Sequence, residues 1–124
     1  MRRWVVEVFD DMVYGTTKVY SSTRWNKLLA EPEQLVVQAV ADQTGGTSPT
    51  VRVELEHSTD QINWALESTL FTASTPPGTT TSLFGSDDGA TPGGGFARLA
   101  VSLTGTTPSA HLTITVCGRN GATS

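Results

Sequence analysis

The sequence has a single cysteine, Cys117, among its 124 residues. One thiol cannot form an internal disulfide, and it cannot build a cysteine-based zinc site. Charge is also scarce, because charged residues make up 16% of the chain and the formal net charge is −4. Only Arg2 and Arg3 form a locally basic segment, whereas contacts with nucleic-acid phosphates need clustered Lys and Arg. We therefore expect no nucleic-acid partner.

Long apolar runs are missing as well. No run approaches the roughly 20 residues that a membrane-spanning helix needs. The residues after Met1 become charged within a few positions, which does not fit a signal peptide. The sequence thus predicts a protein that is made in the cytoplasm and has no membrane partner.

Threonine and serine take the place of the missing charge. The chain contains 20 Thr and 11 Ser, which together are a quarter of its residues. Thr suits a pleated, half-exposed strand, whereas Ser and Gly suit turns. Three Trp and four Phe are available for a core, so the composition favours one all-β domain over residues 1–124 rather than a disordered chain.

Apolar and polar residues alternate in several short segments, as expected for strands with one buried face. The predicted strands are 4–9, 18–20, 35–42, 50–57, 97–103 and 111–117. Turn residues at 43–49 and 105–109 predict two hairpins, which would pair 35–42 with 50–57 and 97–103 with 111–117. Asp10 and Asp11 are expected to end the first strand.

The remaining segments contain little helix signal. A helical turn is plausible only at 26–33, where Pro32 limits its length. Residues 72–95 are rich in Thr, Gly and Pro and predict a long loop, with Leu83 and Phe84 as its anchor. About six to eight short strands with almost no helix indicate an antiparallel β-sandwich, with a jelly roll as its form.

The residue types used in catalysis show no catalytic pattern. His57 and His111 both fall in predicted strands, where an edge or surface position is expected, and no Gly-x-Ser-x-Gly elbow is present. The adjacent carboxylates at 10–11 and 87–88 suit strand ends and solvated turns. We therefore predict no enzymatic activity, no bound metal and no other cofactor.

A polar turn from Ser58 to Asn63 is followed by Trp64, and such a turn can hold calcium, bind a sugar or close a β-sandwich. The alternating Asp spacing of a calcium loop is absent. Sugar-binding sandwiches stack aromatic rings on pyranose rings, but the tryptophans here are not regularly spaced along one strand. The available aromatic residues are Trp4, Trp25, Trp64, Tyr14 and Tyr20. We predict that Trp64 seals the edge of the core.

Two stretches resemble a known group of proteins. The segment VELEHSTDQINW, an alternating strand followed by the motif Ser-x-Asp-x-x-x-Trp, resembles a recurrent pattern of small phage virion β-proteins. The ending ARLAVSLTGTTPSAHLTITVCGR resembles the final hairpin of jelly-roll head-decoration proteins of tailed phages. Together they cover about a third of the chain. Sugar-binding sandwiches use a similar motif, Ser-x-Asp-Gly-x-x-Trp. This sequence departs from that motif because Gln61 stands at the position of the Gly.

The resemblance implies a structural protein that decorates the capsid surface of a virion and binds the major capsid protein lattice, with self-association as a homotrimer. An N-terminal segment at 1–10 that is apolar on both faces suits a docking arm or subunit contact. Nearby arginines would suit an acidic shell. The predicted partner-binding residues are Arg2, Arg3, Trp4, Val5, Phe9, Arg24 and Trp25. The alternative is a carbohydrate-binding β-sandwich used in host attachment, and an enzyme on the same scaffold is a third hypothesis.

Overall fold

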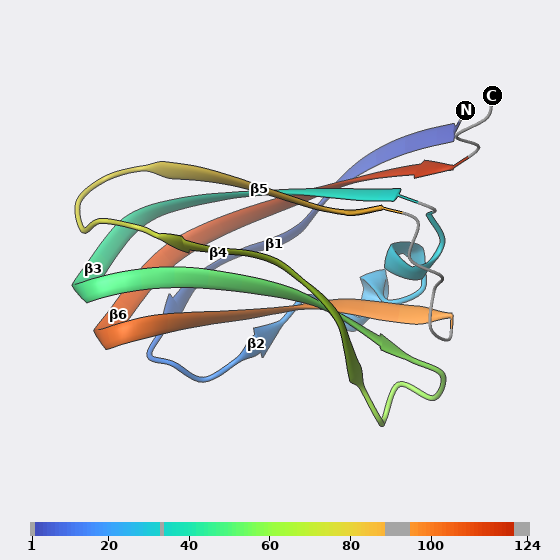
Figure 1. The fold of residues 1–124 in the computed structure, drawn as a ribbon, viewed down its shortest axis with the longest axis horizontal. Helices are drawn as coiled ribbons and strands as arrows, with labels where there is room; N and C mark the ends of the chain where they lie inside the picture. The colour runs from blue at the N-terminus through green and yellow to red at the C-terminus, as the bar shows by residue number, and fades with distance from the viewer. Residues whose placement is uncertain (1, 33, 89–94, 121–124) are drawn as a thin grey trace.

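The computed structural model describes residues 2–32, 34–88 and 95–120, which form an antiparallel β-sandwich of the jelly-roll type (Figure 1). The strands are β1 (Arg2–Tyr14), β2 (Val19–Tyr20), β3 (Gln34–Ser58), β4 (Ala65–Ser74), β5 (Thr81–Asp88) and β6 (Phe96–Asn120). Two short 3-10 helices, η1 (Thr23–Trp25) and η2 (Leu28–Ala30), lie between β2 and β3. The predicted all-β fold with little helix is confirmed.

The two longest strands, β3 and β6, pair with each other on both sides of a shared bend. Val37 pairs with Val116 before the bend, and Val53 pairs with Val101 after it. Figure 1 shows both strands turning back at the same end of the molecule. The bend folds one hydrogen-bonded sheet into two layers that face each other.

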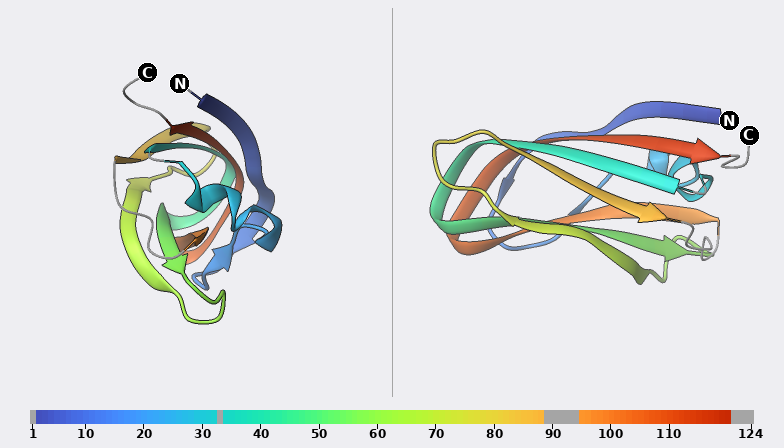
Figure 2. Two further views of the ribbon diagram at one scale, coloured as in Figure 1. Left: turned by 90° about the vertical axis from the view of Figure 1, so that its right-hand side faces the viewer. Right: turned by 45° about the horizontal axis from the view of Figure 1, so that its top comes forward.

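Each layer takes one half of both long strands. The first layer contains β1, β5 and the segments 34–42 of β3 and 111–120 of β6. The second layer contains β2, β4 and the segments 50–58 and 96–104. Figure 2 shows the two layers from two further directions.

The predicted strands in β3 and β6 are present, but their predicted pairing was wrong. Residues 43–49 and 105–109 are bends inside single strands and not hairpin turns. The segment 35–42 pairs with β6 residues 111–118, and 50–57 pairs with 97–104. Gly, Pro and short polar residues suit a sandwich corner as well as a hairpin turn, so local sequence does not separate the two.

Two glycines make room for the shared bend. Gly46 and Gly105 have φ angles of +95° and +122°, which L side chains rarely adopt. A Cβ atom on Gly46 would lie 2.6 Å from the carbonyl oxygen of Thr107. One on Gly105 would lie 2.7 Å from the carbonyl oxygen of Thr47. Each glycine therefore lets its strand pass close to the backbone of the other strand at the corner.

The apolar faces of the two layers meet in one core. Alternate residues of both halves of β3 and β6 point inward and are almost completely buried, as the alternating sequence predicts. They are Leu35, Val37, Ala39, Ala41, Val51, Val53, Leu55, Ala97, Leu99, Val101, Leu103, Leu112, Ile114 and Val116. At the end opposite the bends, η2 adds Leu29 and Ala30 to this core. In the part of the chain that the structure describes, no helix has the length and apolar character needed to cross a membrane.

Strand β1 is longer than the sequence predicts. Asp10 and Asp11 were expected to end a strand at 4–9, but β1 continues to Tyr14. Asp10 pairs with Thr113 of β6, so the two carboxylates lie within the strand. Because β1 is hydrogen-bonded to β6 along its length, the N-terminal segment is an edge strand of the sheet and not a separate arm.

A β-bulge explains why both faces of this segment look apolar. The register of β1 with β6 shifts between Glu7 and Phe9. The extra residue turns the strand over, so Val8 is buried and Phe9 packs against the core. Val5 lies on the other face and is 60% exposed. Within one chain, the core therefore covers only one face of the strand at Val5.

The predicted loop at 72–95 was wrong for residues 72–74, which end β4, and for residues 81–88, which form β5 and pair with β3. Residues 89–94 of the predicted loop lie outside the described residues. Leu83 is buried in the core as its anchoring role requires, whereas Phe84 is 64% exposed. The strand was hard to recognise because short polar residues hold most of its outward positions, and these residues are equally common in loops.

Candidate ligand-binding site

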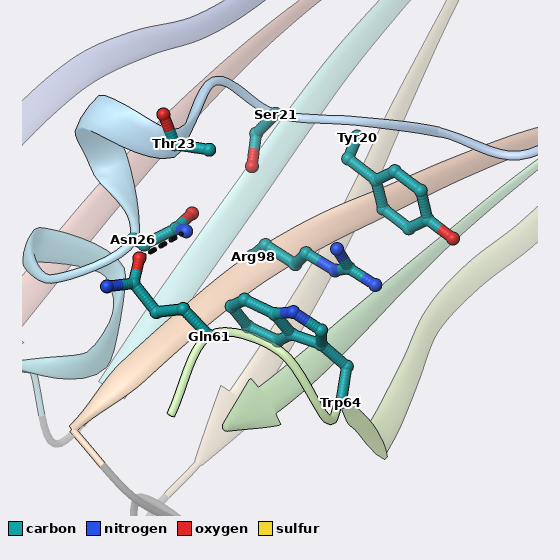
Figure 3. A pocket seen from close by; sticks show the side chains of 7 residues that line it. All are labelled: Tyr20, Ser21, Thr23, Asn26, Gln61, Trp64 and Arg98. Atoms are coloured by element: carbon teal, nitrogen blue, oxygen red, sulfur yellow. Dashed lines mark hydrogen bonds between the residues drawn. The ribbon is translucent and has the colours of Figure 1, made fainter. Parts of the chain in front are cut away.

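A pocket of about 220 Å³ opens between the end of β2, helix η1, the turn at 58–64 and the start of β6 (Figure 3). Its wall combines two aromatic rings with hydroxyl, amide and guanidinium groups. The lining residues are Tyr20, Ser21, Thr23, Asn26, Gln61, Trp64 and Arg98. They come from three separate stretches of sequence that the fold brings to one end of the second layer.

Arg98 of β6 lies between the two aromatic rings of the pocket. Its guanidinium carbon is 3.7 Å from the centre of the Tyr20 ring and 4.2 Å from that of the Trp64 ring. Figure 3 shows the guanidinium group enclosed by the two rings. Cation–π contacts contribute roughly 0.5–2 kcal/mol each, depending on how far the cation is desolvated. Arg98 thus holds both rings in a fixed arrangement.

Two buried carboxylates on β3 balance the positive charges around Arg98. Glu54 and Glu56 are only 4% and 7% exposed. Arg98 Nε donates a hydrogen bond of 2.8 Å to Glu56 Oε1. Lys18 Nζ lies 3.1 Å from Glu54 Oε1, and this hydrogen bond raises the pKa of Lys18. Arg52 also pairs with Glu54, at 3.2 Å. Each of these cations is therefore matched to a carboxylate.

The polar turn predicted before Trp64 is present, and side chains hold its backbone. Ser58 Oγ accepts hydrogen bonds from the N–H groups of Asp60 at 3.1 Å and Gln61 at 2.8 Å. Asp60 Oδ1 accepts from the N–H groups of Asn63 at 2.8 Å and Ile62 at 2.9 Å. The hydrogen bonds from these backbone N–H groups hold the pKa of Asp60 well below its usual range, and the bond from Asn63 has the largest effect. The acidic side chain of the turn is thus engaged by the turn itself.

Gln61 and Asn26 meet at the pocket wall. Gln61 has a φ angle of +59°, a left-handed conformation that glycine adopts more easily. It occupies the position at which the Ser-x-Asp-Gly-x-x-Trp motif of sugar-binding sandwiches has Gly. Asn26 Nδ2 donates a hydrogen bond of 3.0 Å to Gln61 Oε1. Asn26 is 3% exposed, and its Oδ1 atom has no hydrogen-bond partner within the described residues. Such a buried, unpartnered acceptor is rare in native proteins.

Trp64 lies outside the core, contrary to its predicted role as an edge plug. Its ring is half-buried in the pocket wall and is not part of the cluster of buried apolar residues. The sequence placed the turn correctly, but the partner of the ring is Arg98, which comes from a distant strand. Trp64 is therefore a pocket residue.

Three of the predicted partner-binding residues point toward the interior. Trp4, Phe9 and Trp25 are partly buried and pack against the core. A Cβ atom on Gly118 would lie 2.3 Å from the Trp4 ring, so this ring lies directly over the glycine of the neighbouring strand. These three side chains therefore contribute to the folded body of the domain.

The other predicted partner-binding residues are spread over two elements. Arg3 and Val5 are exposed on β1, whereas Arg24 is exposed on η1 and stacks on Trp25 at 4.7 Å. The backbone of Arg2 begins β1, and its side chain lies outside the described residues. The structure does not bring the predicted set together in one cluster.

His111 bridges two carboxylates on the outer face of the first layer. Its Nδ1 lies 2.8 Å from Asp42 Oδ1, and its Nε2 lies 2.6 Å from Asp10 Oδ1. These hydrogen bonds raise the pKa of His111, and the bond with Asp42 has the largest effect. Both ring nitrogens are engaged, so neither is placed to take a proton from a hydroxyl nucleophile. Over residues 2–32, 34–88 and 95–120, no group of three metal-ligating side chains is arranged to hold a metal ion.

The sequence does not predict the pocket as a whole. Tyr20 and Trp64 appear among its aromatic candidates, but Asn26 and Arg98 belong to no recognisable motif. One local signal was available, because Gln61 replaces a glycine in a turn that needs positive φ. The remaining contacts depend on how β2, η1 and β6 meet in space.

No protein-family model matches the sequence, and no curated protein matches it. Several solved structures are similar in fold. One holds the CBM22-1 and GH10 modules of Clostridium thermocellum endo-1,4-beta-D-xylanase 10B, complexed with xylohexaose. Its TM-score is 0.65 at 13% identity, and the match covers 98% of this chain and 25% of that chain.

Two isolated modules match over most of their own length. The C-terminal family 22 carbohydrate-binding module of Clostridium thermocellum Xyn10B has a TM-score of 0.61 at 12% identity, covering 96% of this chain and 82% of that chain. The CBM22-1 xylan-binding domain of Paenibacillus barcinonensis Xyn10C has a TM-score of 0.59 at 10% identity, covering 95% and 87%. This chain therefore has the fold of a single jelly-roll module, and it spans about a quarter of the xylanase chain. At these identities the likeness concerns the fold alone.

Proposed function

We propose that this chain is a non-enzymatic binding module that holds a glycan in the pocket lined by Tyr20, Asn26, Gln61, Trp64 and Arg98 and serves in host attachment. The observation that carries the proposal is the composition of this pocket. Aromatic rings, amides, hydroxyls and a guanidinium group converge there within about 220 Å³. Ligand sites typically combine apolar and aromatic walls with a few placed polar groups.

A sugar ring matches this combination of surfaces. Its C–H faces are apolar and suit aromatic side chains, while its hydroxyl rim both donates and accepts hydrogen bonds. Arg98 covers the inner faces of Tyr20 and Trp64, so a bound sugar contacts the remaining ring surface. Its hydroxyl groups then face the amides of Asn26 and Gln61.

The likeness to solved structures supports a binding role of this kind. Two similar structures are described as a carbohydrate-binding module and a xylan-binding domain, and a third was determined with xylohexaose. The occupied nitrogens of His111 favour a binding protein over an enzyme.

A glycan array with wild-type protein and two variants tests the proposal. Trp64→Ala removes a pocket wall, whereas Tyr14→Ala removes an aromatic side chain that is 71% exposed and does not line the pocket. We expect wild-type protein and Tyr14→Ala to retain the same glycans and Trp64→Ala to lose them while remaining folded. Unchanged retention by Trp64→Ala, or no retained glycan for the wild type, would contradict the proposal.

A second candidate function is decoration of a phage capsid by binding to the major capsid protein, as a homotrimer on the virion surface. The outer face of the first layer favours it, because Val5 and Phe84 are 60% and 64% exposed there. Val5, Cys117 and Val36 lie in one row across three strands of this face. Exposed apolar side chains on a sheet face are typical of protein contacts.

Co-sedimentation with empty phage heads tests this second candidate. Val5→Asp and Phe84→Asp should prevent co-sedimentation, whereas Trp64→Ala should leave it intact because the pocket is elsewhere. Light scattering should show a trimer. A monomer that fails to bind heads would exclude this role without affecting glycan binding.

A further inference from the structure

We infer that the pocket selects neutral glycans over acidic ones, through an unpartnered acceptor on Asn26 and cations that are already paired. This inference rests on the proposed glycan-binding function and specifies its ligand class. The relevant atom is Asn26 Oδ1, which is buried and without a hydrogen-bond partner among the described residues. A ligand that donates a hydrogen bond there removes the cost of an unsatisfied buried acceptor.

The fold fixes the direction of the Asn26 side chain. The Asn26 backbone N–H donates to Thr23 O at 3.1 Å, and its carbonyl oxygen accepts from the Ala97 N–H at 2.8 Å. Its Nδ2 is engaged by Gln61 at 3.0 Å. Figure 3 shows the other end of the amide, Oδ1, directed away from Gln61. Because Asn26 lines the pocket, a ligand group that reaches Oδ1 has to donate a hydrogen bond, which sugar hydroxyls and amide N–H groups do and a carboxylate does not.

The cations at this end of the second layer offer an acidic sugar little compensation. Arg98 Nε is bonded to Glu56, and aromatic rings cover the guanidinium. Lys18 is paired with Glu54 at 3.1 Å. A carboxylate on the ligand would have to compete with these pairs, and losing one partner of a buried pair is costly. The net charge of −4 also disfavours the approach of acidic polymers.

The volume of the pocket limits how much of a glycan can enter it. At about 220 Å³ it is smaller than the sites that take drug-sized molecules, which begin at roughly 300 Å³. One sugar residue, rather than an extended chain, therefore occupies it. Selection then depends on whether that residue carries a carboxylate.

Matched monosaccharide pairs test the inference directly. The probes are methyl glucoside with methyl glucuronide, and methyl galactoside with methyl galacturonide, which differ only at C6. Titrations are followed by the NMR signal of the Trp64 indole. We expect wild-type protein to bind the better neutral member about tenfold or more tightly than its acidic counterpart, equivalent to the loss of one satisfied polar contact.

Two variants identify the group responsible. Asn26→Leu removes Oδ1, whereas Tyr14→Ala removes an exposed aromatic side chain that does not line the pocket. Asn26→Leu should weaken neutral binding about tenfold with no loss of thermal stability, since an unsatisfied acceptor is removed, while Tyr14→Ala should stay within about threefold of wild type. Equal or preferential binding of the acidic sugars, or full binding by Asn26→Leu, would overturn this inference and leave glycan binding standing. If the wild type binds neither these probes nor any glycan on the array, both proposals fail.

Discussion

The guanidinium carbon of Arg98 lies 4.2 Å from the centre of the Trp64 ring. Arg98 is itself held by Glu56 on the neighbouring strand, so the end of the 58–64 turn is attached to the second layer by stacking and charge. The core lies beneath this arrangement and does not include Trp64. The pocket can therefore be altered without dismantling the fold.

Replacing Trp64 by Ala should cost less stability than replacing a core residue. We expect about 1–2 kcal/mol from lost stacking and partial burial. Leu103→Ala, at a fully buried position, should cost about 2–5 kcal/mol. Urea unfolding of both variants measures the difference. An equal loss would mean that Trp64 supports the core after all.

Neutralising Glu56 should loosen the pocket as well as weaken the fold. Glu56→Gln breaks the bond to Arg98 and the 3.6 Å contact with Lys18. Because both cations retain some exposure, we expect a loss of about 1–2 kcal/mol, less than for a fully buried pair. Glu7→Gln, at an exposed position of β1, is the control and should change stability by less than about 0.5 kcal/mol. Similar effects for the two variants would show that the Glu56 pair is energetically unimportant.

Glycine substitutions at the bend should be far more harmful than at an open turn. Gly46→Ala and Gly105→Ala each force a Cβ atom into backbone of the opposite strand in addition to an unfavourable φ angle. We expect a loss of about 3 kcal/mol or more, or failure to fold. Gly78→Ala has a φ of +77° but meets nothing within 4 Å, so it should lose only about 1–2 kcal/mol. Thermal melting of the three variants measures these losses of stability. Similar losses for all three variants would mean that the bend is not tightly packed.

The stabilisation by His111 should decline as pH rises. Its pKa is raised in the folded protein by Asp42 and then Asp10, so the folded state binds the proton more tightly than the unfolded chain. The contribution is complete below the unfolded pKa of about 6.5 and disappears as pH passes the raised folded value. Because the side chain is partly exposed, His111→Gln should lose at most about 1 kcal/mol at low pH and progressively less above neutrality. A difference that grows with pH in urea unfolding would contradict this assignment.

Much of the secondary structure could be predicted because it depends on local pattern. Val51, Val53 and Leu55 alternate with polar residues, and the structure buries all three. The turn from Ser58 to Asn63 is also local, since its side chains bond to backbone groups only a few residues away. Strand β5 was missed because most of its outward positions hold the same small polar residues that fill loops.

The sequence by itself thus determined the all-β class, most strand positions and the inward faces, because period-two alternation and turn chemistry act over neighbouring residues. Only the tertiary structure decided that β3 and β6 bend together instead of forming two hairpins, since Gly46 and Gly105 serve either geometry until the strands pair. Only the tertiary structure, likewise, placed Arg98 between Tyr20 and Trp64 and left Asn26 Oδ1 without a partner. Such contacts join residues far apart in the chain, and they exist only once the sheet has folded over itself.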